Sequence, residues 1–414
     1  MTRNIPYDTI ARIAIYALLI FAPLARGAVQ PWAITVIHLL TLLALAAFLL
    51  ARCHQGRFQW IATPLDRPLA AVVALVLVSA GFSLYRPASL RAVMLLIDYV
   101  VVFYLAIHLF NSRERMRRLV EVIVAVALFL AIFGLVKRFG ANPFPWWDYG
   151  ELRYQPEFLA ATYGNHNHLA GFMEMAIPLT LSLLFTGLGL GWRMGIAYLA
   201  LLQLTALALS LSRGGWVGAL VGLAFFAWAL MTSRYFMAKK TLGSAIGTFV
   251  LLALVVLASS PVVARIQTVV ETDEAASLAS RLIAWQGTVR VIADHPLLGT
   301  GPGTFATVFP QYQPPGLSAR FTKAHNDYLD FVSETGLLLI PLFLWMAAAL
   351  FAKGFQKLKN PSRLARGVTL GALTGIVAIL IHSISDFNLQ IPANALLFTV
   401  LAAMVAAPLR HLTQ

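Results

Sequence analysis

Apolar stretches of about 20 residues recur along almost the whole chain, and this feature limits the possible folds most strongly. An α-helix rises about 1.5 Å per residue, so about 20 apolar residues cross the ~30 Å hydrocarbon core of a bilayer. Twelve stretches fit this description, near residues 9–25, 32–51, 69–85, 90–110, 119–137, 169–187, 192–211, 215–232, 242–260, 327–351, 367–385 and 390–408. The sequence therefore predicts an all-α polytopic membrane protein with about 12 transmembrane helices.

The composition agrees with this class of protein. Hydrophobic residues make up 59% of the chain and charged residues only 12%, whereas a soluble domain carries roughly 25% charged residues. This excludes an ordinary soluble enzyme and a disordered chain. Cys53 is the single cysteine, so no disulfide forms within the chain. The first apolar stretch is too long for a signal peptide and lacks an A-x-A cleavage site, so we expect a retained helix.

The net charge of +14 is explained by membrane topology. An even number of spans places both termini on one side, and cytoplasmic segments are enriched in Lys and Arg. If the termini are cytoplasmic, 19 of the 31 Lys and Arg residues lie inside, and five of the other 12 lie in one long outer loop that this rule discounts. We therefore expect a polytopic membrane protein with cytoplasmic termini and no nucleic-acid partner.

Two predicted outer segments are too long to be simple turns, and they suggest a division of the chain. Spans one to nine occupy residues 1–260 and include a smaller periplasmic loop at about 138–168. The large periplasmic loop occupies 261–325, and the last three spans occupy 326–414. Long ordered loops are usually functional, so we expect the chemistry on this side.

The large loop contains an amphipathic stretch at residues 280–295. Leu282, Trp285, Val289 and Ile292 recur at helical spacing. Such a helix either lies on the outer membrane surface or packs on the loop's own core. The glycine-rich turn at 299–303 follows it and lacks the Gly-Lys-Ser/Thr ending of a P-loop, so we do not expect it to bind a nucleotide.

His325 is the candidate general base. It is followed by Asn326 and Asp327 at the start of the predicted tenth span, and an unperturbed histidine has a pKa of ~6.5, suitable for proton transfer near neutral pH. On a helix Asn326 and Asp330 share a face, which makes both candidate substrate contacts. The alternative is that these residues only cap an interfacial helix.

Two arginines on the predicted outer side are candidate ligands for phosphate. Arg213 lies in a very short turn and is followed by two glycines that would let a ligand approach the backbone. Arg281 lies in the amphipathic stretch. The guanidinium group offers a rigid fork of donors that suits phosphate oxygens. The alternatives are that Arg213 reaches lipid headgroups and that Arg281 is an ordinary surface residue.

Further polar groups lie near the predicted outer ends of the spans. Asn165, His166 and His168 lead into the sixth span, where they either contact substrate or cap the helix; no accompanying ligand pattern favours zinc. The aromatic run at 142–149 suits sugar stacking or an interfacial belt. Ionisable groups within or near a membrane span are costly and usually have a function or a partner. Asp98, His382 and Asp386 therefore either orient a catalytic residue or pair with a neighbouring helix.

Taken together, these motifs resemble those of the O-antigen ligase and polymerase superfamily. The matching segments appear in order between about residues 160 and 345: 212–215 (SRGG), 280–285 (SRLIAW), 295–303 (HPLLGTGPG), 324–329 (AHNDYL) and 334–336 (ETG). The ligase signature begins with His-Asn and has a glycine ten residues after the Asn, which His325, Asn326 and Gly336 fit. A small or hydroxyl residue is expected three places later, where this chain has Leu339.

The resemblance implies a specific chemistry. Such proteins are inverting glycosyltransferases of the GT-C type that act on the periplasmic face of the inner membrane. Their donor is a glycan on undecaprenyl diphosphate, and they need no metal or other cofactor. Here it implies that His325 deprotonates the acceptor hydroxyl while Arg213 and Arg281 bind the diphosphate. A leaving diphosphate gains negative charge, which arginine forks stabilise.

Three functional alternatives remain open. A ligase passes the glycan to a sugar of lipid A–core, whereas a polymerase passes it to another lipid-linked repeat. The compact size and the single large outer loop favour the ligase, and Leu339 favours the polymerase. A transporter of a lipid-linked glycan would need polar groups across the bilayer midplane, but the candidates gather on the outer side. A membrane scaffold would leave His325 and the two arginines unexplained.

Overall fold

The computed structural model describes residues 6–56, 58–140, 142, 158–233, 235–236, 275–315 and 321–408. This part of the chain is helical and contains no strand. The α-helices are α1 Tyr7–Leu24, α2 Pro31–Gln55, α3 Asp66–Gly81, α4 Arg86–Leu109, α5 Arg113–Phe139, α6 His166–Ser182, α7 Leu190–Leu209, α8 Arg213–Thr232, α11 Ala275–Asp294, α12 Phe305–Val308, α13 Asp327–Thr335, α14 Leu339–Lys357, α15 Arg363–His382 and α16 Pro392–Ala406. Short 3₁₀ turns are η1 Arg26–Ala28, η3 Leu183–Phe185, η5 Phe309–Gln311 and η6 Asn388–Gln390.

Within the described residues, nine helices are long and apolar enough to cross a membrane: α1, α2, α4, α5, α6 with η3, α7, α8, α14 and α15. The prediction of an all-helical polytopic membrane protein is confirmed. The predicted third and twelfth spans form the shorter helices α3 and α16, of 16 and 15 residues. The predicted ninth span, 242–260, lies outside the described residues, so the count of about 12 stays a prediction.

The single helix predicted over 327–351 is wrong, because the chain breaks there into α13 and α14. Gly336 ends α13 with φ 83° and ψ 171°, a backbone region that is essentially restricted to glycine. A Cβ at this position would also overlap the carbonyl oxygen of Leu297. Hydropathy continues across the break, and for this reason the apolar pattern alone joins the two helices.

We expect Gly336→Ala to lower the free energy of unfolding by at least about 2 kcal/mol, since the strained backbone and the overlap with Leu297 add. Thermal unfolding of the purified protein in detergent measures the change. The matched control is Gly195→Ala in α7, where an added Cβ meets nothing within 4 Å. Equal unfolding temperatures for Gly336→Ala and the wild type would contradict this account of the break.

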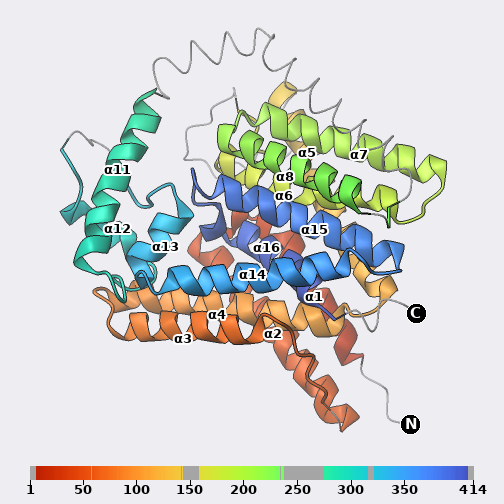
Figure 1. Ribbon diagram of the computed structural model, residues 1–414, viewed down its shortest axis with the longest axis horizontal. Coiled ribbons are helices and arrows are strands. Elements are labelled where there is room, and N and C mark those ends of the chain that lie inside the picture. The colour runs from red at the N-terminus through yellow and green to blue at the C-terminus, as the bar shows by residue number, and fades with distance from the viewer. Residues whose placement is uncertain are drawn as a thin grey trace.

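The helices form a bundle with a separate lobe at one end (Figure 1). α15 packs against both α6 and α8, and α6 and α15 are the most buried of the described candidate spans. α11, α12 and α13 make the lobe, at the left of Figure 1, and α1 begins at the opposite end of the bundle. We call the end that carries the lobe the site end.

The amphipathic stretch lies in α11, and its apolar stripe is only partly buried in the lobe. Leu282 and Val289 are 47% and 54% exposed. Ala284, Thr288 and Val291 are buried instead. Ala284 packs in an apolar cluster with Phe305, Phe309 and Ala324. Small residues on α11 thus allow close packing within the lobe, and part of the predicted stripe faces outward.

The glycine-rich turn at 299–303 is held by the protein's own carboxylate. Gly303 and Phe305 donate their backbone N–H groups to Glu334, at 2.7 and 3.1 Å. Ser79 of α3 donates to the backbone oxygens of Leu298 and Glu334. The amides that a P-loop would offer to phosphate are therefore occupied, and the turn fastens the lobe to α3.

Candidate functional site

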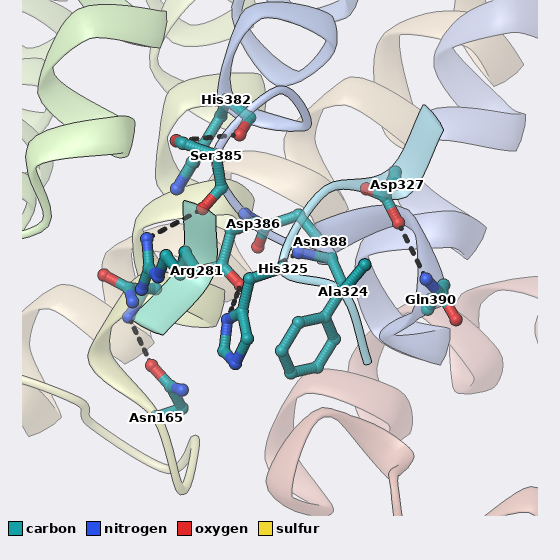
Figure 2. A network of polar contacts seen from close by, with 12 residues as sticks. Asn165, Arg281, Ala324, His325, Asp327, His382, Ser385, Asp386, Asn388 and Gln390 are labelled. Carbon is teal, nitrogen blue, oxygen red and sulfur yellow. Dashed lines mark hydrogen bonds and ion pairs between the residues drawn. The ribbon is translucent and has the colours of Figure 1, made fainter. Parts of the chain in front are cut away.

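His325 and Asp386 meet at the site end although they lie 61 residues apart. Nδ1 of His325 lies 3.3 Å from Oδ1 of Asp386 (Figure 2). The imidazole side chain is 28% exposed, whereas the carboxylate is 1% exposed. A buried carboxylate on Nδ1 leaves Nε2 of the exposed ring as the atom that can accept a proton from a substrate.

The backbone around His325 is strained and held on both sides. His325 has φ 53°, a left-handed conformation that is uncommon for a residue with a side chain. Before it, the N–H of Ala324 donates to both carboxylate oxygens of Asp330, at 3.0 and 3.1 Å. After it, the N–H of Asp327 donates to the backbone oxygens of Ser383 and Asp386. Strain maintained by such contacts is typical of functional sites.

Asn326 and Asp330 have the structural partners that the helix-capping alternative describes. Asn326 caps α13, since its Oδ1 accepts the N–H of Leu329 at 3.0 Å. Asp330 is fully buried, and it binds Gln390 as well as Ala324. Burial raises the pKa of Asp330 to about 7, against the lowering effect of these donors. Both residues thus position the segment that carries His325.

Asp386 is ionised in this setting. Burial alone would raise its pKa, but the hydrogen bond from His325 and the nearby His168 and His382 outweigh burial and hold the pKa below its ordinary value. The N–H of Phe387 donates to the same oxygen, Oδ1, at 2.9 Å. A charged acceptor fixed in this way orients the imidazole and stabilises it once it is protonated.

Arg281 of α11 reaches the same turn. Its Nη1 donates to the backbone oxygen of Ser385, the residue before Asp386, at 2.8 Å (Figure 2). The side chain is partly buried. A long guanidinium with one donor used keeps further N–H groups for a ligand, so Arg281 brings positive charge next to the His325–Asp386 pair.

Arg213 is exposed at the first position of α8. The next residue, Gly214, packs so closely on α15 that an added Cβ would lie 2.5 Å from the ring of His382 and 2.6 Å from Oγ of Ser385. Ser212 caps α8, and Leu211 before it has φ 54°. The start of α8 is thereby fixed against the turn that also receives Arg281.

Three helix N-termini converge at this place. α8 begins at Arg213, α13 begins beside His325, and α6 begins after its cap Asn165, whose side chain accepts the N–H of Asn167 at 2.8 Å. Gly215 of α8 packs on Ala170 in the first turns of α6. The positive ends of helix dipoles attract anions, so the convergence favours a negatively charged ligand.

The two histidines of α6 also face this region. His166 stacks on Phe158, with ring centroids 4.3 Å apart. His168 is buried and meets Phe387 edge-on at 4.9 Å. The ring of His325 meets the same Phe387 ring edge-on, with centroids 4.9 Å apart. The structure therefore brings His325, Arg281, His166 and His168 around the 385–387 turn.

The remaining ionisable groups pair with neighbouring helices. His382 binds Glu174 of α6 through Nδ1 at 3.0 Å, and both side chains are at most 1% exposed. Asp98 of α4 pairs with His38 of α2. These are the helix-pairing alternatives that the sequence left open. The predicted aromatic run at 142–149 lies almost wholly outside the described residues.

Among the described residues, no group of three or more His, Cys, Asp and Glu side chains is arranged to hold a metal ion. The sequence analysis singled out both Asp386 and His325 but did not pair them. It missed Ser385 and Phe387, whose roles arise from a backbone oxygen and a ring face. No sequence pattern marks such contacts, since they depend on how α15 and α16 pack.

The fold and site define a helical membrane protein with an anion-attracting site beside one histidine and two arginines. A comparison with protein families matches residues 198–344 to the model described as O-antigen ligase. This match confirms the resemblance over residues 198–344, which are similar to a family that implies a ligase or glycosyltransferase-type enzyme with lipid-linked glycan substrates. No curated protein matches the chain.

The match separates two parts of the site. Arg213, Arg281 and His325 lie within residues 198–344. His168 and Asp386 lie outside that range and enter the site through the fold alone.

We expect Asp386→Asn to reduce the turnover number by about 10²-fold or more, because the amide lacks the charge that stabilises protonated His325. Glycan-transfer kinetics measure the loss. Asp294→Asn, at the exposed end of α11, is the matched control and should keep wild-type turnover. A wild-type rate for Asp386→Asn would contradict an orienting role.

The lowered pKa of Asp386 also determines the direction in which the stability of the folded protein changes with pH. A carboxyl group with a depressed pKa in the folded chain adds stability above its ordinary pKa of about 3.9, and this contribution is lost as the pH falls below that value. The stability that wild type holds over Asp386→Asn should therefore decrease as the pH is lowered below about 4, and the difference in unfolding temperature measures it.

Proposed function

We propose that the protein is an inverting, metal-independent glycosyltransferase that transfers a glycan from undecaprenyl diphosphate to a sugar hydroxyl of lipid A–core. The observation that carries this proposal is the pairing of a partly exposed His325 with the buried carboxylate of Asp386, next to Arg281. A base beside fixed positive charge suits attack by a hydroxyl on a carbon that bears an anionic leaving group.

In the proposed reaction, Nε2 of His325 takes the proton of the acceptor hydroxyl. The hydroxyl oxygen attacks the anomeric carbon from the face opposite the diphosphate, and the bond from that carbon to the diphosphate oxygen breaks with inversion. Asp386 stabilises the imidazolium that forms. The donor is already activated by its diphosphate, so the step needs no nucleotide.

Arg213 and Arg281 are proposed to bind the diphosphate and stabilise the charge that it gains on leaving. The convergent N-termini of α6, α8 and α13 support this assignment, because their dipoles favour an anion. Asn165 and His166 at the start of α6 remain proposed contacts for the substrate. The basic residues at the other end of the bundle support a periplasmic site and cytoplasmic termini.

A polymerase that joins two lipid-linked repeats is the second candidate. In the sequence, the departure from the ligase signature at Leu339 favoured the polymerase. Leu339 is 2% exposed and packs in an apolar cluster with Val72 and Val93. The departure thus concerns the packing of α14 on α3 and α4 rather than a polar site group, which removes the argument against the ligase. A lipid-linked glycan transporter gains no support from groups gathered at one end.

The experiment supplies both acceptors together. Purified protein in liposomes receives a lipid-linked glycan donor, lipid A–core and a second, labelled lipid-linked repeat, and the products are separated by mass. Glycan on lipid A–core supports the ligase. Extension of the labelled repeat alone would contradict the ligase function and support the polymerase function. The absence of product from both acceptors would contradict glycan transfer altogether.

A further inference from the structure

Asp386 has one oxygen that the described structure leaves without a partner. Oδ1 accepts from His325 and from the N–H of Phe387. Oδ2 is buried and has no hydrogen-bond partner within the described residues. A buried carboxylate oxygen without a donor costs free energy comparable to a lost hydrogen bond. A second donor to Asp386 is therefore expected nearby.

His168 is placed to be that donor. Its Nε2 is also buried and without a partner in the described part of the chain. His168 and His325 each meet the ring of Phe387 edge-on, with centroids 4.9 Å away and interplanar angles of 72° and 74°. Phe387 is the residue after Asp386, so two imidazoles lie around one carboxylate.

The backbone fixes His168 in this position. Its carbonyl oxygen accepts from Nδ2 of Asn394 in α16 at 2.9 Å. Asn394 in turn binds Asn388, which belongs to the segment just after Asp386. His168 and Asp386 are thus held by the same short stretch of chain, although they come from α6 and the turn after α15.

We propose that His168 donates a hydrogen bond from Nε2 through one buried water to Oδ2 of Asp386, and thereby positions the carboxylate that orients His325. This inference rests on the proposed function, in which His325 is the base. His168 is a positioning residue and does not touch substrate. Three side chains from three segments then act in series: His168, Asp386 and His325.

Removal of the His168 donor should change the electrostatic effect of Asp386 on His325 in a definite direction. A donor on Oδ2 draws negative charge away from the oxygen that faces His325. Its removal leaves the carboxylate more negative toward His325, which favours the protonated imidazole. The other charged or titratable groups around the turn are His166 and Glu174 of α6, His382 of α15, Arg281 of α11 and Asp327 of α13, and they are unchanged by a substitution at His168.

The test compares His168→Phe with His168→Gln. Phenylalanine keeps a ring beside Phe387 and removes the donor, whereas glutamine retains an N–H near the position of Nε2. His168→Phe should lower the turnover number about tenfold to hundredfold with unchanged KM for donor and acceptor. His168→Gln should stay within about threefold of wild type. The control His54→Phe, at an exposed site in α2, should equal wild type.

A second measurement does not depend on transfer. Diethyl pyrocarbonate modifies neutral imidazole, and mass spectrometry follows the rate at His325 as a function of pH. The midpoint should move up by about half a pH unit in His168→Phe and stay in place in His168→Gln. If the wild type transfers no glycan, the proposed function fails, and this midpoint still decides the role of His168.

Three results would overturn the inference. One is a wild-type turnover number and midpoint in His168→Phe. Another is an equal loss in His168→Phe and His168→Gln, which would mean that the donor does not matter. The third is a change in KM alone, which would make His168 a substrate contact.

Discussion

Replacing His325 by alanine is expected to lower the rate of glycan transfer by about 10²- to 10⁴-fold, the range that a positioned general base contributes. The side chain is partly exposed, and among the described residues its polar side-chain partner is Asp386. Alanine therefore removes the proton acceptor and one of the two donors to Oδ1 of Asp386, and leaves the N–H of Phe387 as the other. Initial rates with saturating donor and acceptor measure the effect.

The backbone conformation at His325 calls for a control. Since φ is 53°, alanine also alters local strain, and His325→Asn provides a variant that tolerates the left-handed region and lacks the base. Both variants should fold, bind donor and fail to turn over. A His325→Asn enzyme with more than about a tenth of the wild-type rate would contradict the base role.

Replacing either arginine should have the next largest effect. We expect Arg281→Ala and Arg213→Ala each to reduce turnover by about 10²- to 10³-fold, because a leaving diphosphate loses one of its charged donors. Lysine should restore little at either position, since it lacks the planar fork. Transfer kinetics and donor binding measure the two steps separately.

The matched control lies on the same helix as Arg281. Arg290 of α11 is exposed, and Arg290→Ala removes the same charge from the lobe while leaving the 385–387 turn untouched. Wild-type turnover is expected. If Arg290→Ala and Arg281→Ala lose activity equally, the general positive charge of the lobe, rather than a specific phosphate contact, would be responsible.

The spans were predictable because each depends on local sequence. Length and apolarity located eight of the nine described candidate spans and joined the ninth, α14, to α13. A family motif pointed to His325, Arg213 and Arg281. The break at Gly336 was not recovered, since it depends on the approach of Leu297 to a glycine in a sequence that stays apolar on both sides. The helix break depends on the backbone conformation of Gly336, which a hydropathy pattern does not reveal.

The buried face of α11 shows a second limit. The spacing of Leu282 and Val289 left open whether they face the membrane surface or the core of the loop, and both are exposed while Ala284 and Thr288 pack inside. Large apolar residues remain favourable at a surface that lies near lipid, so hydrophobic spacing is an ambiguous guide there. The lobe instead uses small residues where Phe305 and Phe309 approach, with ring centroids 4.8 Å apart.

The support of the site depends on distant contacts. Asp386 reaches His325 only because the start of α13 is tied to the turn after α15 through Asp327. His168 reaches the same turn because α6 and α15 pack together in the core. Sequence reasoning named these residues as polar groups near the outer ends of spans, but it could not assign partners to them.

The most direct measurement of the central account is transfer in liposomes with a defined lipid-linked donor and lipid A–core, in the presence of a metal chelator and without ATP. The account predicts full activity for the wild type, inverted configuration at the anomeric carbon, and a loss of at least about 10²-fold in His325→Ala. Retained configuration, a requirement for ATP or metal, or a wild-type rate in His325→Ala would contradict it.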